Sequence, residues 1–401
     1  MSFEQDVKEG TVSGALEDLK VVELRQGIAA AYCGMLLSDL GAQVVLVEDS
    51  HLVEDDPPPD ARLYLDRNKL STILDMGIDQ HRRILNDLVN WSDIVIEELL
   101  PETRKAWGID PRQLCQERTS LIYGAISPFG RSSIEDDRPA TDLIVQAKSG
   151  FMSITGLPDN PYTRSGTSVS EYYTGVATSI AILAALRHRD NTGEGQMIDM
   201  SLFDTLLTAL DVPDLYFRTG EVRPRTGNMN PALPGYGFSK AADGFVATAT
   251  PGFNIWPRFC IAIDRIDLVD RPQFNSQEEQ KQWGAVVVEA INAFFLTRSR
   301  AEIVEHLVAH DVPAAPVNTL KEAVLEPPLR ERGMLVDIDH PERGKVTITG
   351  SPLHMSETPG TVQRPPQIRG QDSAYVIHEL LKLPDDEASV VLGQLKLGGE
   401  S

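Results

Sequence analysis

The segment from Leu19 to Glu48 constrains the fold more than any other part of the chain. It opens with the short apolar run LKVVEL and closes with AQVVLVE, which is rich in β-branched residues. Between them, in RQGIAAAYCGMLLSDLG, apolar residues recur at helical spacing, and Gly41 follows where a left-handed C-cap is expected. A strand, a helix and a strand of this length predict a βαβ unit with parallel strands, and therefore an α/β fold.

The alternation of strands and helices continues beyond this unit and indicates how the chain divides into domains. STILDM, DIVIEEL and LIYGAIS are expected as strands, and HRRILNDLVNW as a helix. The helix expected over 172–189 is apolar nearly all round, which predicts burial. From about Arg223 the chain is rich in Pro and Gly, as is typical of a linker. We predict a large domain from 1–222 plus 335–401, and linkers with a smaller α/β domain over 223–334.

The charge of the chain limits the partners that it can have. Lys and Arg together number 37 and Asp and Glu 59, which gives a formal net charge of −22. A field of this sign repels nucleic acids and anionic membranes, so we expect neither as a partner. We also expect no bilayer-spanning segment. A ligand that carries phosphates would need a local concentration of positive side chains.

Cysteine usage and the N-terminal sequence indicate the compartment. Cys33, Cys115 and Cys260 lie far apart and form no CxxC pair, so we expect neither a disulfide framework nor a zinc site. The first residues, MSFEQDVKEGTVSGALEDL, contain no basic region followed by an apolar stretch, so we expect no secretory signal. These features predict a cytoplasmic protein.

Several common cofactor and catalytic motifs are missing. The loop after the first strand is RQGIA at 25–29, not GxGxxG, so it gives no support for a dinucleotide cofactor. The sequence contains neither a Walker A motif nor a GxSxG nucleophile elbow. His306 and His310 stand four apart in HLVAH, which lacks the glutamate of a zincin, so we expect no metal there. These residues alone predict an α/β protein with a ligand at the strand ends.

An ordered set of motifs resembles the class III CoA transferases, the family of formyl-CoA transferase and α-methylacyl-CoA racemase. The resemblance is nearly end to end and includes RNKLSTILDM at 67–76, DIVIEELLPETRKAWGID at 93–110, TGVATSIAILAALRHRDNTGEGQMIDMSLFD at 174–204 and VPAAPVNTLKE at 312–322. The resemblance implies a Rossmann-like large domain, a smaller α/β domain and two interlocked subunits. It also implies acyl-CoA and a small carboxylic acid as substrates, with no permanently bound cofactor.

The resemblance implies a carboxylate nucleophile at the start of the apolar helix. In the family an aspartate attacks the acyl thioester, and the matching residue here is Glu171 in SVSEYYTG. The additional methylene shifts the carboxylate by roughly an ångström, which matters for a reacting group. Ser168-x-x-Glu171 also fits a capping box, in which Glu171 would only bond a backbone N–H. Both roles remain open from the sequence.

The residues that would bind CoA by this resemblance fall in three places along the chain. They are the loop residues Gly27, Ile28 and Ala29, the cations Arg67 and Lys69, and Leu99, Arg104 and Lys105 at and after the end of the fourth expected strand, DIVIEEL. Small loop residues allow a ligand to approach the backbone. The chain departs from the family at Glu98-Leu99, where Asn-Phe is usual, and at Asp49-Ser50, where a basic residue often stands.

Three functions are therefore compatible with the sequence. The first is an active CoA transferase with Glu171 as nucleophile. The second is a non-catalytic subunit paired with an aspartate-bearing paralogue, as in the benzylsuccinate CoA transferase type, and the departures at Glu171 and Glu98 point to it. The third is an acyl-CoA racemase or isomerase. We rank it last, because Thr141, before the DLIVQ run expected as a strand, stands where the racemase has its histidine.

Overall fold

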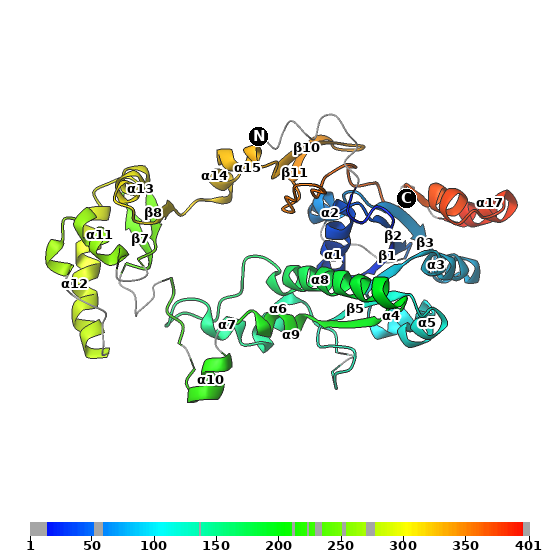
Figure 1. Cartoon of the computed structure of the whole chain (residues 1–401), viewed down its shortest axis with the longest axis horizontal. Coiled ribbons are helices and arrows are strands. Elements are labelled where there is room, and N and C mark those ends of the chain that lie inside the picture. The colour runs from blue at the N-terminus through cyan, green and yellow to red at the C-terminus, as the bar shows by residue number, and fades with distance from the viewer. Residues whose placement is uncertain are drawn as a thin grey trace. The chain divides into compact units, whose positions relative to one another are not determined.

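The computed structural model divides the chain into two units (Figure 1). The first comprises residues 1–151, 165–214 and 327–401, and the second comprises 152–164 and 215–326. The residues that the structure describes are 14–51, 59–135, 138–210, 213–222, 224–228, 235–250, 254–269 and 277–395.

A parallel sheet of six strands forms the centre of the first unit. Its strand order is β3-β2-β1-β4-β5-β6. The strands are β1 (Lys20–Arg25), β2 (Gln43–Asp49), β3 (Leu70–Leu74), β4 (Ile94–Glu98), β5 (Ile122–Ser127) and β6 (Met197–Ser201). The predicted α/β fold with parallel strands is confirmed. The chain adds β2 and β3 on one side of β1 and then β4, β5 and β6 on the other. At this switch point between β1 and β4, a crevice opens at the carboxyl ends of the strands.

Helices cover both faces of this sheet, which explains why its central strands are continuous apolar runs. One face packs against α1 (Ile28–Asp39), α6 (Asp142–Lys148), α8 (Val169–Thr192) and α9 (Leu202–Thr208). The other packs against α3 (Asp79–Trp91), α5 (Pro111–Glu117), a π-helical turn over Val376–Leu380 and α17 (Asp385–Gln394). The short helix α4 (Pro101–Ala106) follows β4, and α16 (Ser373–Tyr375) directly precedes the π-helical turn. The remaining helices of this unit include α2 (Pro59–Leu65) and α15 (Pro327–Glu331).

One predicted strand is a helix. The DLIVQ run forms α6, because its buried residues Asp142, Val145 and Gln146 recur at helical spacing, on one side of the segment. Thr141 is the N-cap of this helix.

The long helix α8 crosses the sheet beside α1 (Figure 1). It ends at Gly193, whose φ of 78° gives the left-handed C-cap. By length and composition alone α8 could span a membrane, contrary to our expectation from the sequence, although half of its apolar window is buried within the protein. Such burial is also typical of the core helix of a globular domain.

The contact between α1 and α8 depends on the missing side chain of Gly175. A Cβ atom there would lie 2.8 Å from the carbonyl oxygen of Ala29 and 3.0 Å from Cβ of Tyr32. We expect Gly175→Ala to lower the free energy of unfolding by about 1–3 kcal/mol, because backbone atoms must move apart. Urea unfolding followed by circular dichroism measures this change. Gly393→Ala in α17 is the matched control, since no atom lies within 4 Å of its Cβ position, and it is expected to leave stability unchanged or slightly raised. Equal effects of the two substitutions would contradict this account of the helix contact.

The C-terminal segment returns to the first unit and completes it. A hairpin of β10 (Leu335–His340) and β11 (Gly344–Thr349) precedes an extended stretch, then α16, a π-helical turn over Val376–Leu380 and α17. Asp372 makes two hydrogen bonds to the backbone of Ser71 in β3. Its carboxylate accepts the N–H of Ser71 at 2.8 Å, and its own N–H donates to the carbonyl oxygen of Ser71 at 2.9 Å.

The second unit has its own sheet and core. The antiparallel strands β7 (Gly237–Ala241), β8 (Gly244–Thr248) and β9 (Ala314–Pro316) pack against three helices. These are α11 (Ile255–Ala262), α12 (Gln277–Phe295) and α13 (Arg300–Ala309). The short helices α7 (Phe151–Ile154), α10 (Pro213–Thr219), α14 (Leu320–Ala323) and a 3-10 turn at Ile266–Leu268 lie in or beside this unit along the chain.

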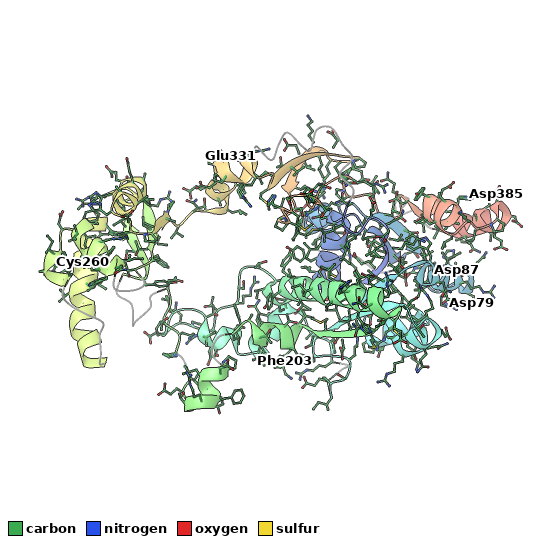
Figure 2. All side chains as sticks on the ribbon, in the orientation of Figure 1. Asp79, Asp87, Phe203, Cys260, Glu331 and Asp385 are labelled. Carbon is green, nitrogen blue, oxygen red and sulfur yellow. The ribbon has the colours of Figure 1, made fainter. Side chains whose placement is uncertain are left out.

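Charged side chains of the first unit include acidic groups on its outer helices. Figure 2 shows Asp79 and Asp87 on α3 and Asp385 on α17, all exposed. In the second unit the figure marks Cys260, which is buried and unpaired, as is Cys33 of α1. Burial raises the pKa of both thiols to about 12, so neither is expected to act as a thiolate nucleophile near neutral pH.

Candidate functional site

A cavity of about 420 Å³ opens at the carboxyl ends of β1, β4 and β5, where the strand order reverses. Its wall comes from the loops that follow these strands and from the beginnings of α6, α8 and α9. The charged and polar residues that line it are Gln26, Glu98, Arg131, Arg138, Thr141 and Glu171. Two of the predicted CoA-binding residues, Gly27 and Leu99, line it as well. In an open parallel sheet this is where a ligand is expected.

Glu171 lies in the first turn of α8 and is 8% exposed. Ser168 is the N-cap, but its side chain makes no cap hydrogen bond, so the Ser168 half of the capping box that the sequence allowed is not formed. The helix start is held instead by Asp142, whose Oδ1 accepts hydrogen bonds from the backbone N–H (2.9 Å) and the hydroxyl (2.7 Å) of Ser170. Asp142 of α6 therefore anchors the turn of α8 that carries Glu171.

Glu98, the last residue of β4, points to the N-terminus of α1. Its Oε2 accepts the N–H of Ala30 at 2.8 Å. A Cβ atom on Gly27, the N-cap of this helix, would lie 2.5 Å from Oε1 of Glu98. Of the predicted loop residues, Gly27 therefore lines the cavity, whereas Ile28 and Ala29 are buried in the core.

A buried carboxylate beneath the cavity holds two arginines. Glu97 is fully buried, and its Oε2 lies 3.1 Å from Nη2 of Arg131, while its Oε1 lies 3.3 Å from Nη1 of Arg104. Burial raises the pKa of Glu97, and the charge of Arg131 opposes that shift. Arg131 also donates to the carbonyl oxygens of Leu99 (2.6 Å) and Ile126 (3.1 Å). Because two guanidinium groups share one carboxylate, this cluster of Glu97, Arg104 and Arg131 by itself carries a net positive charge.

A second, larger pocket of about 730 Å³ adjoins the cavity. The two share Pro101 and Arg131 as lining residues. Four cations line it, namely Arg104, Lys105, Arg112 and Arg131, together with Asp110 and Asp199. Both acidic groups are already engaged by backbone N–H donors: Asp110 by Arg112 and Gln113, and Asp199 by Arg131 and Ser132. The predicted cations Arg104 and Lys105 thus lie in a locally positive pocket of an acidic chain.

The other two predicted cations lie inside the first unit. Arg67 and Lys69 are each 1% exposed. The guanidinium of Arg67 makes two hydrogen bonds to Asp39, at 2.8 and 2.6 Å, and Nζ of Lys69 lies 2.7 Å from Oε2 of Glu23. Burial lowers the pKa of Lys69, and Glu23 opposes that shift. This geometry favours a structural role for both side chains over contact with a ligand.

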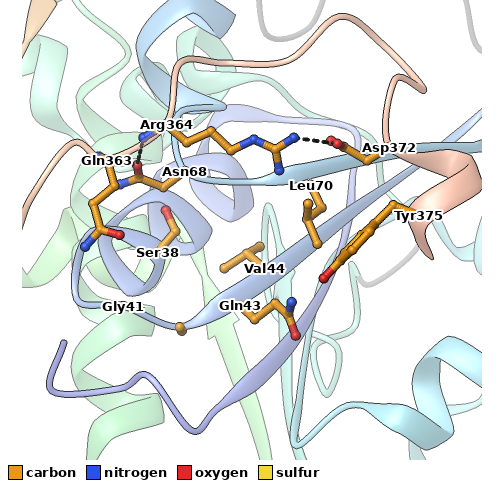
Figure 3. Close-up of a pocket in the computed structure, with 11 residues that line it drawn as sticks. Ser38, Gly41, Gln43, Val44, Asn68, Leu70, Gln363, Arg364, Asp372 and Tyr375 are labelled. Carbon is orange, nitrogen blue, oxygen red and sulfur yellow. Dashed lines mark hydrogen bonds and ion pairs between the residues drawn. The ribbon is translucent and has the colours of Figure 1, made fainter. Parts of the chain in front are cut away.

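A third pocket, of about 460 Å³, lies near the starts of β2 and β3, at the opposite edge of the sheet (Figure 3). Arg364 and Asp372 form an ion pair across it, and Oδ1 of Asn68 accepts the backbone N–H groups of Gln363 and Arg364 at 2.8 and 2.9 Å. These contacts fasten the C-terminal segment to the sheet. The pocket contains none of the predicted site residues.

Three of the polar and charged cavity residues were not predicted from the sequence, namely Gln26, Arg131 and Arg138, while Thr141 was expected only as the position of the racemase histidine. Gln26 directly precedes the loop glycine, and its Oε1 accepts the N–H of Leu100 at 3.1 Å. Its position after the first strand was the available signal. The arginines carry no local pattern, because they come from the irregular segment after β5. Thr141 has no titratable side chain, so this position offers no general base.

The structure describes no group of three or more potential metal ligands in the ranges given above. His306 and His310 pack within the second unit. Nε2 of His306 lies 2.8 Å from the carbonyl oxygen of Ala262, and Nδ1 of His310 lies 2.8 Å from that of His306.

Comparison with known proteins identifies the chain's relatives. The model of CoA-transferase family III matches residues 16–373. The succinyl-CoA:mesaconate CoA-transferase of Haloarcula hispanica is 34% identical over 86% of this chain and 91% of its own. The beta subunit of the succinyl-CoA–L-malate CoA-transferase of Chloroflexus aurantiacus is 29% identical over 94% and 96%. The crystal structure of a CaiB/BaiF family protein from Brucella suis has a TM-score of 0.80 and 27% identity, and covers 92% of this chain and 100% of its own.

Proposed function

The chain belongs to CoA-transferase family III, and from that premise we propose that it moves CoA from an acyl-CoA donor to a carboxylic acid acceptor through a covalent intermediate on Glu171. The position of this carboxylate in the wall of the switch-point cavity is the observation that carries the proposal. The dipole of α8 favours negative charge at this end of the helix, where Glu171 lies.

The proposed reaction proceeds in four balanced steps. The Glu171 carboxylate attacks the thioester carbonyl, which gives a mixed anhydride and CoA thiolate. The thiolate attacks the glutamyl carbonyl, which releases the donor acid and leaves a glutamyl-CoA thioester. The acceptor carboxylate then attacks this thioester, and a second anhydride forms as thiolate leaves. Finally the thiolate attacks the acceptor's carbonyl, which yields the new acyl-CoA and regenerates Glu171.

We assign the phosphates of CoA to the positive pocket beside the cavity. Arg104 and Lys105 line it, as do the unpredicted Arg112 and Arg131. Because the two pockets share Pro101 and Arg131, one extended ligand can occupy both. Gly27 and Leu99 would contact the part of CoA that enters the cavity.

The names of the relatives suggest which carboxylic acids the protein uses as CoA donor and acceptor. Two of them carry succinyl-CoA together with mesaconate or L-malate in their names. We propose succinyl-CoA as the donor and a short dicarboxylic acid as the acceptor. Arg131 and Arg138 supply positive charge in the cavity wall for a second carboxylate.

We propose that the protein is a cytoplasmic dimer with interlocked subunits, each with a Rossmann-like large domain. The strand order of the large sheet supports the Rossmann-like domain. An apolar stripe on α8 supports association, because Tyr173, Val176, Ile180 and Leu183 recur every three or four residues and are 36–62% exposed.

A second candidate function is that of a non-catalytic subunit. Glu171 stands in place of the family's aspartate, and one relative is named as a beta subunit. In this case a paralogue with an aspartate would co-purify with the chain, and the isolated chain would transfer no CoA.

Trapping of the intermediate tests the first candidate. We expect incubation with succinyl-CoA and hydroxylamine to convert Glu171 into its hydroxamate, because anhydrides and thioesters react with this nucleophile. Peptide mass spectrometry locates the modification. Glu98 is the matched control, since it lines the same cavity and should remain unmodified. Turnover without modification at Glu171 would overturn the assignment.

A further inference from the structure

Glu98 occupies the place where the fold offers a binding site for an anion. In an open parallel sheet, the helix that follows β1 directs its free N–H groups and its positive dipole end into the switch-point crevice. Here that helix is α1, and its Ala30 N–H donates to Oε2 of Glu98 at 2.8 Å. The positive end of the helix is therefore matched by a carboxylate of the chain itself.

The fit between Glu98 and the helix end is close. Gly27, the N-cap, has no side chain, and a Cβ atom there would lie 2.5 Å from Oε1 and 2.9 Å from Oε2 of Glu98. Its φ of −156° is open to any residue, so the space for the carboxylate is what favours glycine here. Glu98 is only half-buried, because one side of it faces the same cavity as Glu171.

We propose that Glu98 is a specificity-determining residue, whose carboxylate excludes the carboxylate or phosphate of a ligand from the α1 end of the cavity. Anionic groups of the ligand are then directed to the side of Arg131 and Arg138. The α1 end accepts a group that can donate a hydrogen bond to Glu98, such as an amide N–H or a hydroxyl. The arm of a CoA thioester carries both kinds of donor. This inference rests on the proposed function for the identity of the ligand, but not for the anion site.

Substitution of Glu98 by a small residue should open that site to an added carboxylate. We expect acetate to raise the Tm of Glu98→Ala, and of Glu98→Ser as a second small variant, because it replaces the missing carboxylate at the N–H of Ala30. The affinity of the variants for acetate should exceed that of the wild type by at least about tenfold, the worth of a hydrogen bond to a charged group. Chloride at equal ionic strength is the reference salt.

Two further variants distinguish the effect of opening space at position 98 from the effect of removing one negative charge. Glu98→Gln still fills the position and should gain no acetate affinity. Glu102→Ala removes the same charge from an exposed site in α4 that lines neither pocket, and should behave as the wild type. Equal responses of the wild type and Glu98→Ala to acetate, or no response of either small variant, would overturn the proposal. Since Tm requires no turnover, this result is independent of whether the protein transfers CoA. If the wild-type protein transfers no CoA while the small variants show the predicted acetate response, only the proposed function is rejected.

Discussion

Replacement of Glu171 by glutamine is expected to lower kcat for CoA transfer by about a thousandfold or more, because the amide cannot attack a thioester. Glu171→Asp keeps the nucleophile but withdraws it by roughly an ångström, so we expect a loss of at most about a hundredfold. Initial rates with succinyl-CoA and a dicarboxylic acid, followed by separation of the CoA esters, measure both effects.

The two variants together distinguish the candidate functions. Glu102→Gln, on the surface of α4, is the charge-matched control and should retain the wild-type rate. A Glu171→Gln protein as active as the wild type would remove the covalent role of this residue. Activity that appears only with an aspartate-bearing paralogue, and that survives Glu171→Gln, would establish the non-catalytic subunit instead.

Replacement of Arg67 by methionine is expected to lower the free energy of unfolding by about 3–5 kcal/mol, because it leaves the buried carboxylate of Asp39 without its cationic partner. The guanidinium also donates to the carbonyl oxygen of Thr349 at 3.1 Å, so it links the C-terminal hairpin to the sheet. Urea unfolding of the purified protein measures the loss.

A double substitution provides the control for this prediction. Asp39→Leu combined with Arg67→Met removes both charges and should recover much of the lost stability. The KM for acyl-CoA of the folded variants should equal that of the wild type. A stable Arg67→Met protein with a raised KM would show that Arg67 contacts the ligand, as the resemblance implied.

Local sequence patterns were sufficient to predict most of the large sheet. The apolar runs around Val22, Val45 and Val95 form neighbouring parallel strands, and α8 ends at Gly193. These features follow from periodicity and from the conformational freedom of glycine, which act over a few residues. The prediction of a strand for the DLIVQ run was wrong, because a short apolar segment fits both the helical and the strand period until its packing partners are known.

The candidate site was predictable only in part. Glu171, Gly27 and Leu99 line one cavity, and Arg104 and Lys105 line the pocket beside it. The burial of Arg67 and Lys69 could not be inferred, because their partners Asp39 and Glu23 lie far away in the sequence and meet them only in the folded sheet. The same limit applies to Glu98, whose orientation depends on a helix formed 68 residues earlier.

The pairing of Asp372 with Ser71 has a consequence for biosynthesis. The two partners are separated by 301 residues, so the outer edge of β3 is translated long before the segment that covers it. During this interval the nascent sheet presents an open strand, which is a template for association with other chains. A chain truncated within the second unit should therefore be prone to aggregate. Chaperones that shield strand edges should bind the nascent chain late in its elongation.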